Sequence, residues 1–301
     1  DPLWSRGLGD VYKRQAGEST ATLLQVTDDS GLAVILKHPA RRLISLSPHL
    51  TELVYAAGAG NTLVGVAAYS DYPPEAARLP VISMAGRVDI ERVLALAPDL
   101  IVAWKSGNPS ASVTRLQALG LPIYLSEPQK LTDIPLQLER LGYLADTLPQ
   151  AQYVADQFRN TLTDLTNRYA HRSPVSVFYQ IWDSPLVTVG PDHLFSQVLA
   201  TCGGKNVLTG TRGLAPTVGL EVVLKANPEA IIASGTDGSP PPWLNRWQRW
   251  QQLLAVARGN IFHIHPDFIQ RPTPRLLQGA EQLCEQLDKV REQRTLFPNS
   301  P

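Results

Sequence analysis

The sequence predicts an α/β protein with two lobes of βα units, joined by one long helix. Short apolar strands alternate with short helices along most of the chain, which is typical of parallel sheets with helical crossovers. Between residues 150 and 170, apolar residues recur at helical spacing and no strand signal interrupts them. In addition, one segment of the chain recurs 130 positions later, which indicates that one lobe has been built twice.

The first half of the chain carries the clearest strand signals. Residues 23–36 (LLQVTDDSGLAVIL) predict a β-hairpin, with turn chemistry at Asp29-Ser30-Gly31. Four short apolar segments follow, and the helices between them end at glycines such as Gly120. The predicted strands are 41–47, 63–68, 99–104 and 121–126.

The pattern changes in the middle of the chain. From 133 to about 172 the spacing predicts helices, including one within 149–171 that would span about 30 Å, the width of a domain. After it, residues 175–182 (VSVFYQIW) predict a strand, and residues 192–204 predict a helix that ends in glycines.

The repeated segment defines the domain organisation. VDIERVLALAPDLIVA (88–103) and VGLEVVLKANPEAIIA (218–233) are identical at seven of 16 positions, and each predicts a short helix, a proline stop and a buried strand. Chance similarity between two αβ units is the alternative explanation. We expect two Rossmann-like lobes and a non-native leader, with the boundaries 1–16 for the leader, 23–145 for the N-terminal lobe, 146–172 for the bridging helix and 173–291 for the C-terminal lobe.

The composition excludes several classes of protein. Twenty-seven basic residues balance 27 acidic ones without a long run of either sign, so nucleic acid and anionic membranes are not expected partners. There is no GxxxxGK[ST] phosphate loop and no GxSxG nucleophile motif. His263 and His265 could share one face of a strand and hold a metal, although no third ligand is near and an exposed polar face is the simpler interpretation. These motifs name no catalytic residues, and an enzyme stays an open alternative at this point.

Aromatic and hydrogen-bonding residues follow several of the predicted strands. Tyr69 follows 63–68, Trp104 ends 99–104, Trp182 ends 175–182, and 267–271 follow the last strand. Ligands of open α/β sheets bind outside the carboxyl ends of the strands. Each residue alone could be the edge of a core. Together they predict a cleft between the lobes that suits a large, flat molecule with a rim of amides.

Four segments carry a resemblance to a known family. Residues 41–76, 88–108, 198–206 and 271–287 resemble the periplasmic cobalamin-binding proteins of bacterial vitamin B12 ABC transporters. The resemblance covers roughly residues 23–290, and its most specific parts are YSDYPPEA and AWKSGN.

The resemblance implies a function, partners and a location. It implies a monomeric substrate-binding protein with a rigid helix between its lobes, which captures cobalamin or another corrinoid for a membrane permease. We therefore expect neither an enzyme nor a cofactor. It also implies a periplasmic location, or a tether to the outer face of the cytoplasmic membrane, with the export signal lost from this chain. An iron-siderophore or haem-binding protein of the same fold is the first alternative. A metal-binding protein or an α/β enzyme without a recognisable motif is the second.

The resemblance also assigns ligand contacts. It places Tyr69 against the corrin, Trp104 in the cleft, and Asp267 as a hydrogen-bond partner of the ligand, with Phe268 and Arg271 beside it. These assignments are implied by the family and not by the spacing of the residues.

Further residues near the expected cleft have separate interpretations. We add Trp182 to the ligand contacts because of its position at a strand end. Asp71 is suited to capping the amides of its turn, and we expect it and Tyr72 to shape the loop. The family's best-known member has tryptophans at the positions of Ala85 and Ala215, so we expect a roomier cleft that also suits cobinamide.

Two pairs of residues complete the expectations. Cys202 and Cys284 could be two separate buried thiols, but the resemblance implies a disulfide bond between them. Glu91 and Glu221 occupy matched positions of the repeat, at the start of a helix, where compensation of the helix charge is one explanation. The resemblance implies instead that each projects from one lobe and pairs with an arginine of the permease.

Overall fold

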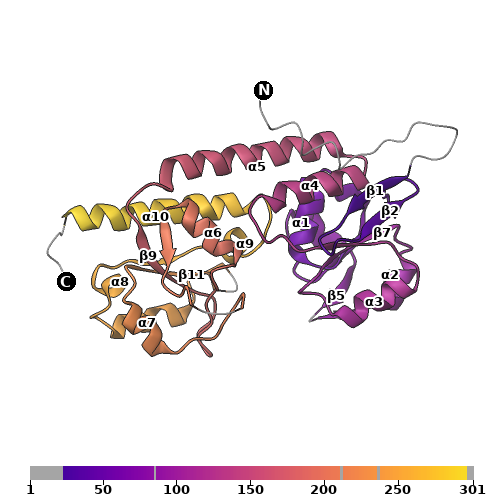
Figure 1. The fold of residues 1–301 in the computed structure, drawn as a ribbon. Coiled ribbons are helices and arrows are strands. Elements are labelled where there is room, and N and C mark those ends of the chain that lie inside the picture. The colour runs from indigo at the N-terminus through magenta and orange to yellow at the C-terminus, as the bar shows by residue number, and fades with distance from the viewer. Residues whose placement is uncertain (1–22, 85, 211–212, 236–237, 297–301) are drawn as a thin grey trace, which may run out of the picture. The chain divides into compact units, whose positions relative to one another are not determined.

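The computed structural model describes residues 23–84, 86–210, 213–235 and 238–296 (Figure 1). The chain divides into two compact units. Unit 1 contains 23–128 and Thr132–Gln157, and unit 2 contains Gln129–Leu131 and 158–296. The leader predicted at 1–16 and the position of Ala85 lie outside the described residues.

Unit 1 contains a two-stranded hairpin and a six-stranded sheet. The sheet has the order β6-β5-β4-β3-β7-β8 and is parallel except at β6, which pairs antiparallel with β5. The strands are β1 (Leu24–Thr27), β2 (Ala33–Leu36), β3 (Leu43–Ser45), β4 (Leu63–Ala67), β5 (Val81–Met84), β6 (Arg87–Val88), β7 (Leu100–Trp104) and β8 (Ile123–Ser126). The hairpin is confirmed at its predicted turn, where the Asp28 carboxylate accepts from Ser30 N at 2.8 Å and Gly31 has a φ of 85°.

The helices of unit 1 complete its βα units. They are α1 (Pro48–Ala56), η1 (Gly60–Thr62), η2 (Pro74–Arg78), α2 (Ile90–Ala95), α3 (Ser110–Ala118) and α4 (Asp133–Leu144). The long predicted helix is α5 (Leu148–Tyr169), and the division between the two units falls inside it. The predicted lobe boundaries themselves stay a prediction.

Unit 2 is built around a four-stranded parallel sheet with the order β10-β9-β11-β12. Its strands are β9 (Val175–Gln180), β10 (Gly204–Asn206), β11 (Ala230–Ala233) and β12 (Ile261–His263). Its helices are α6 (Leu194–Thr201), α7 (Leu220–Ala226), η3 (Pro242–Arg249), α8 (Leu254–Ala257), α9 (Pro266–Ile269) and α10 (Leu276–Leu296). The α/β class with parallel sheets is therefore confirmed.

Two local predictions were incomplete. The helix predicted over 192–204 ends earlier, because Gly203 adopts a φ of 68° and Gly204 already belongs to β10. The strands β5, β6 and β10 were not predicted. They have two to four residues each, and β10 consists of Gly, Lys and Asn, which carry no strand signal of their own.

The internal repeat extends to the backbone conformation. Its two copies fold as α2 followed by β7 and as α7 followed by β11. Ala97 and Asn227, which occupy matched positions directly before a proline, both have a φ of 43°. Asparagine is a common residue at this left-handed end of a helix, whereas alanine is uncommon there. The shared conformation supports a common origin of the two segments.

The repeat also extends to a hydrogen bond, which in each unit joins an acidic side chain to the backbone of a neighbouring strand segment. In unit 1, Asp99 Oδ1 accepts from Arg42 N at 3.0 Å, and in unit 2 Glu229 Oε2 accepts from Ser176 N at 3.1 Å. Burial alone would raise the pKa of Glu229, but hydrogen bonds from Arg294 and Ser176 outweigh burial and hold the pKa below its usual value. Asp99, directly before β7, thus binds the backbone directly before β3, and Glu229, directly before β11, binds the backbone of β9.

Burial of His193 makes the stability of unit 2 dependent on pH. His193 is the N-cap of α6, where its Nδ1 accepts from Phe195 N at 3.0 Å, and burial lowers its pKa from 6.5 to about 4. Between these pH values His193 binds a proton in the unfolded chain but not in the folded chain. The free energy of unfolding therefore falls as the pH falls from about 6.5 to about 4. We expect a loss of about 3 kcal/mol over this window.

The substitution His193→Asn tests this prediction. Asparagine keeps a side-chain acceptor at the N-cap but has no titrating group. Urea unfolding at pH 7, 6, 5 and 4, followed by fluorescence, should show a much flatter profile for the variant than for the parent chain. Parallel profiles would show that another group causes the acid sensitivity.

Candidate functional site

Two of the predicted site residues lie at one edge of the sheet of unit 1. The strands β4 and β7 lie on either side of β3 and run parallel to it, so their carboxyl ends share an edge. Tyr69 follows β4 and is 78% exposed, and Trp104 ends β7 and is 38% exposed. The structure therefore brings these two aromatic residues to the same edge, as the sequence predicted.

Tyr69 has an unusual backbone. Its φ of 64° lies in the left-handed region, which a bulky residue adopts at a cost of about 1–2 kcal/mol. Its ring gains little from burial, since most of it is exposed. A strained and exposed tyrosine is typical of a residue kept for binding.

Replacing Tyr69 with glycine should separate stability from binding. Glycine adopts this φ without strain, so we expect Tyr69→Gly to leave the free energy of unfolding unchanged or to raise it by up to about 1 kcal/mol. The same change should weaken ligand binding, because it removes the ring. Denaturant unfolding and ligand titration on the same preparation measure both. A clear loss of stability would instead make Tyr69 a structural residue.

A buried polar network includes Ser70, the residue that directly follows Tyr69. Thr51 Oγ1 lies 3.0 Å from both Ser45 Oγ and Ser70 Oγ, and all three residues are at least 95% buried. The network joins β3 and α1 to the loop that begins at Tyr69. Its residues were not predicted, although polar residues inside the apolar segment RRLISLSPHLTE are a signal for such a network.

Trp104 is fixed by the residues around it. His49 meets its ring edge-on, with ring centroids 5.1 Å apart, and His49 Nδ1 lies 2.8 Å from Ser47 Oγ. A Cβ atom on Gly107 would lie 1.9 Å from the Trp104 ring, so only glycine permits this ring position. Trp104 N donates to Asn108 Oδ1 at 2.6 Å. The segment AWKSGN therefore holds the ring in place while part of it stays exposed.

Trp182 lies at the corresponding edge in unit 2. It follows β9, is 46% exposed, and donates from Nε1 to the Ser184 carbonyl at 3.1 Å. The strands β9 and β12 are both parallel to β11, so residues that follow them share the carboxyl edge of this sheet. Trp182 and the residues of α9 therefore belong to one edge.

Asp267 of α9 and two arginines that follow this helix form a charged cluster. Asp267 Oδ1 lies 3.0 Å from Arg271 Nη2, and Oδ2 lies 3.5 Å from Arg275 Nη2. The Arg275 guanidinium also lies 4.8 Å from the centroid of the Phe268 ring. The cluster combines carboxylate acceptors with guanidinium donors, the two kinds of group that a polar ligand rim requires.

The two histidines do not share a strand face, so that interpretation was wrong. β12 ends at His263, whose Nε2 lies 2.9 Å from the Ser234 carbonyl. His265 is the N-cap of α9 and its Nδ1 accepts from Asp267 N at 3.2 Å. Within the described ranges, no group of three or more His, Cys, Asp or Glu residues could hold a metal ion.

A second buried network positions α9. Ser234 Oγ accepts from Tyr179 Oη at 2.9 Å and from Gln270 Nε2 at 2.5 Å, which joins β9, β11 and the end of α9. Burial raises the pKa of Tyr179 to about 12, so its hydroxyl remains a donor at neutral pH. This network could not be predicted from the sequence, because its residues lie far apart in the chain.

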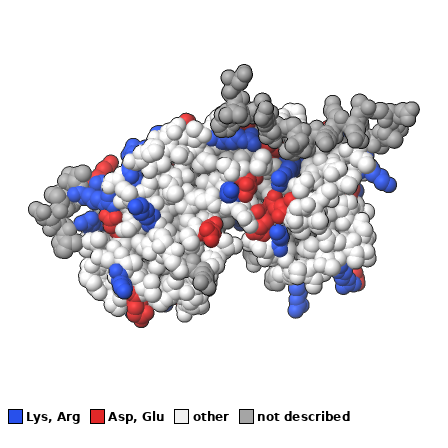
Figure 2. All heavy atoms as spheres, viewed as in Figure 1, with Lys and Arg blue, Asp and Glu red and all other residues white. Residues whose placement is uncertain are grey.

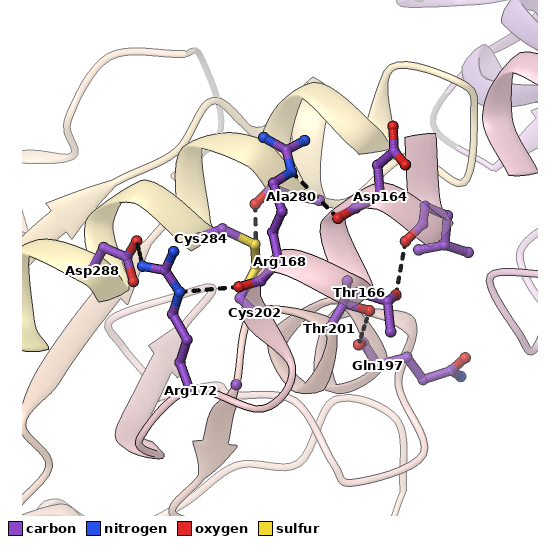
Figure 3. The surroundings of a disulfide bond; sticks show 12 residues. Asp164, Thr166, Arg168, Arg172, Gln197, Thr201, Cys202, Ala280, Cys284 and Asp288 are labelled. Carbon is purple, nitrogen blue, oxygen red and sulfur yellow. Dashed lines mark hydrogen bonds and ion pairs between the residues drawn. A yellow bond between two sulfur atoms is a disulfide. The ribbon is translucent and has the colours of Figure 1, made fainter. Parts of the chain in front are cut away.

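The predicted disulfide bond is present in unit 2. Cys202 directly follows α6 and is bonded to Cys284 of α10, 82 positions later (Figure 3). Both residues are fully buried. Arg291 of α10 adds a hydrogen bond from Nη2 to the Cys202 carbonyl at 2.7 Å. The bond thus attaches the end of α6 to the last helix.

Charged residues do not gather into a patch of one sign on the face that Figure 2 shows. On the side shown in Figure 2, basic and acidic residues are scattered or mixed, and no large area carries a single sign. Glu91 and Glu221 are both exposed, in the first turn of α2 and α7. Ala215 is exposed as well.

Among the described residues, no helix has the length and apolar character needed to cross a membrane.

Comparison with known proteins gives the class of the chain. Residues 43–268 match the periplasmic binding protein family, and the chain belongs to this family. The vitamin B12-binding protein of Vibrio cholerae serotype O1 is 38% identical over 259 residues, which are 85% of this chain and 92% of that protein. The family resemblance inferred from the sequence is therefore confirmed.

Solved structures agree with this assignment. The crystal structure of the periplasmic vitamin B12 binding protein BtuF of Vibrio cholerae matches with a TM-score of 0.78 and 37% identity, and covers 84% of this chain and 99% of that chain. A possible iron-binding periplasmic protein of Staphylococcus epidermidis matches with a TM-score of 0.72 and 26% identity, over 82% of this chain and 98% of that chain.

Proposed function

We propose that the chain is the substrate-binding protein of an ABC importer, which captures cobalamin or a related corrinoid in the periplasm and delivers it to a membrane permease. The observation that carries the proposal is the 38% identity to a vitamin B12-binding protein over 85% of the chain. The exposed aromatic rings at the strand ends support it, because a corrin offers a large flat face with a rim of amides.

Both units carry residues that we propose as ligand contacts. Tyr69 and Trp104 are the proposed ring contacts of unit 1, and Trp182 and Phe268 are those of unit 2. Asp267 accepts from ligand amides, and Arg271 holds that carboxylate in place at 3.0 Å while donating to ligand carbonyls. No catalytic step and no cofactor are needed, since capture is reversible binding.

Trp104 should contribute more to binding than to stability. Its ring packs against the ligand with about 1 kcal/mol beyond its buried area. We expect Trp104→Ala to weaken corrinoid binding tenfold or more, while the melting temperature stays nearly unchanged. Tyr153→Ala is the matched control, because Tyr153 is 60% exposed on α5, away from the strand ends. Unaltered affinity with a collapse of stability would make Trp104 a core residue.

Ala215 bears on the choice of corrinoid. It is exposed and stands where the family's best-known member has a tryptophan, so this position offers a ligand no ring to pack against. A site with fewer walls suits cobalamin with a weaker grip and also suits cobinamide. Titrating both into the variant Ala215→Trp measures this, since a restored wall should tighten binding.

The colour of the purified protein is the first test of the proposed function. Protein purified from cells supplied with cobalamin should be pink and should show the visible absorption bands of a corrin. The alternative, an iron-siderophore or haem binder of the same fold, is favoured by the likeness to a possible iron-binding protein. A preparation that carries a Soret band or a ferric siderophore, and no corrin under these conditions, would favour that alternative.

A further inference from the structure

A cavity of about 170 Å³ lies within unit 2, apart from the residues assigned to the corrin. Its walls are mainly apolar, and we call it the tryptophan pocket. Three tryptophans and two leucines form these walls: Trp243, Trp247, Trp250, Leu186 and Leu220. Sites for drug-sized ligands usually measure about 300–1,000 Å³. The tryptophan pocket therefore suits one small ring system and not a macrocycle.

The tryptophan pocket is at the ligand-binding edge of its sheet. Leu186 follows β9, η3 follows β11, and Leu220 begins α7, the helix that leads back into β11. Leu186 and η3 therefore follow the carboxyl ends of two paired parallel strands, where open α/β sheets bind ligands. Val218, two residues before Leu220, donates from its N–H to the Leu186 carbonyl at 3.0 Å. Asp183, which lines the pocket, is the neighbour of Trp182 in the sequence.

One aromatic wall of the tryptophan pocket, Trp247, is held in place. Trp247 is 95% buried, donates from Nε1 to Gln180 Oε1 at 2.7 Å, and meets Phe178 edge-on at 5.7 Å. Its indole is therefore a fixed wall. Trp243 and Trp250 are only half-buried, so parts of their rings remain open. Indole rings favour a planar aromatic partner that can stack on them or meet them edge-on.

The charges around the tryptophan pocket favour an anion. Arg246 forms an ion pair with Asp183 through Nη1, which neutralises both. Arg249 also lines the pocket and is exposed, and it has no acidic partner in the part of the chain that the structure describes. One positive charge is therefore left over at an aromatic pocket. Guanidinium groups bind phosphate oxygens well, often through two hydrogen bonds.

We propose that the tryptophan pocket binds a planar aromatic ring that carries an anionic group, and that its occupant is the benzimidazole nucleotide of cobalamin. That nucleotide joins a bicyclic aromatic base to a phosphate through a ribose, which matches three indole walls and an unpaired guanidinium. The choice of occupant rests on the proposed function. Cobinamide lacks this nucleotide, so the pocket makes the protein discriminate between the two corrinoids.

Titration calorimetry on the full chain tests the pocket directly. The probes are the ribosyl phosphate of 5,6-dimethylbenzimidazole, cyanocobalamin and cobinamide. The nucleotide should bind the parent chain, and Arg249→Ala should weaken it tenfold or more. Leu220→Phe, which fills the cavity, should weaken it similarly. Lys225→Ala is the control, since Lys225 is exposed in the last turn of α7, at the other end from Leu220, and it should change nothing.

The corrinoid arms identify the occupant. Arg249→Ala should weaken cyanocobalamin at least fivefold and leave cobinamide unchanged. If the nucleotide binds as expected but neither corrinoid binds, the pocket stands as a site for a free aromatic anion and the proposed function fails. If the nucleotide does not bind the parent chain, or binds all variants equally, the inference about the pocket is overturned whatever the corrinoids do.

Discussion

Reversing the charge of Glu91 and Glu221 together should stop uptake without weakening ligand binding. We expect the double variant Glu91→Arg with Glu221→Arg to keep its corrinoid affinity within about twofold in solution. Uptake through the reconstituted transporter should fall at least tenfold, since two repulsive contacts would replace two attractive ones, and such contacts cost several kcal/mol.

The helix environments of the two acids bear on this expectation. α2 already has an N-cap, because Asp89 Oδ1 accepts from Arg92 N at 3.0 Å, so Glu91 is not needed for capping. α7 begins after Gly219 without a side-chain cap, and a Cβ there would lie 2.7 Å from Glu221 Oε2. Compensation of the helix charge, worth about 0.3–1 kcal/mol, therefore explains Glu221 better than Glu91. Docking explains both.

A matched double reversal controls for net charge. Asp156→Arg with Glu281→Arg changes one exposed acid in each unit, on the helices α5 and α10 and away from α2 and α7. The control should transport at the parental rate. Loss of solution affinity in the Glu91 and Glu221 variant would instead make these acids ligand contacts.

Removing the disulfide bond should be the most damaging single change to stability. The Cys202–Cys284 bond closes a loop of 82 positions, which stabilises by about 4–5 kcal/mol in the chain-entropy model. We expect the double variant Cys202→Ala with Cys284→Ala to lose about that much free energy of unfolding. Four of the six tryptophans lie in unit 2, so fluorescence in urea reports mainly on this unit.

Mass spectrometry checks the bond itself. Alkylation under denaturing conditions without reductant should leave the intact mass unchanged, and reduction should expose two thiols. Treating the parent chain with reductant should reproduce the lower urea midpoint of the double variant, while the variant should not respond. Two alkylated thiols in the untreated protein would contradict the bond.

The general architecture could be predicted because it rests on strong local signals. The buried strands β3, β4, β7 and β9 are apolar runs, and α5 has regular helical spacing. The repeat then indicated two related units. Short strands such as β10 carry no such signal, since pairing with β9 creates them.

The candidate site could be predicted only in part. Strand-end aromatics such as Trp104 stand out in the sequence, but the left-handed backbone of Tyr69 and the close approach of Gly107 do not. The networks around Thr51 and Ser234 depend on residues brought together from different elements. The spacing of the two cysteines did not show whether they are bonded, and only the family resemblance indicated the bond.

Titration calorimetry with four ligands tests the central claim most directly. Cyanocobalamin, cobinamide, haem and a ferric siderophore are titrated separately into the ligand-free chain. Our account predicts saturable one-to-one binding of the corrinoids and no comparable heat from haem or the siderophore. Saturable binding of haem or of the siderophore, with no heat from either corrinoid, would contradict it.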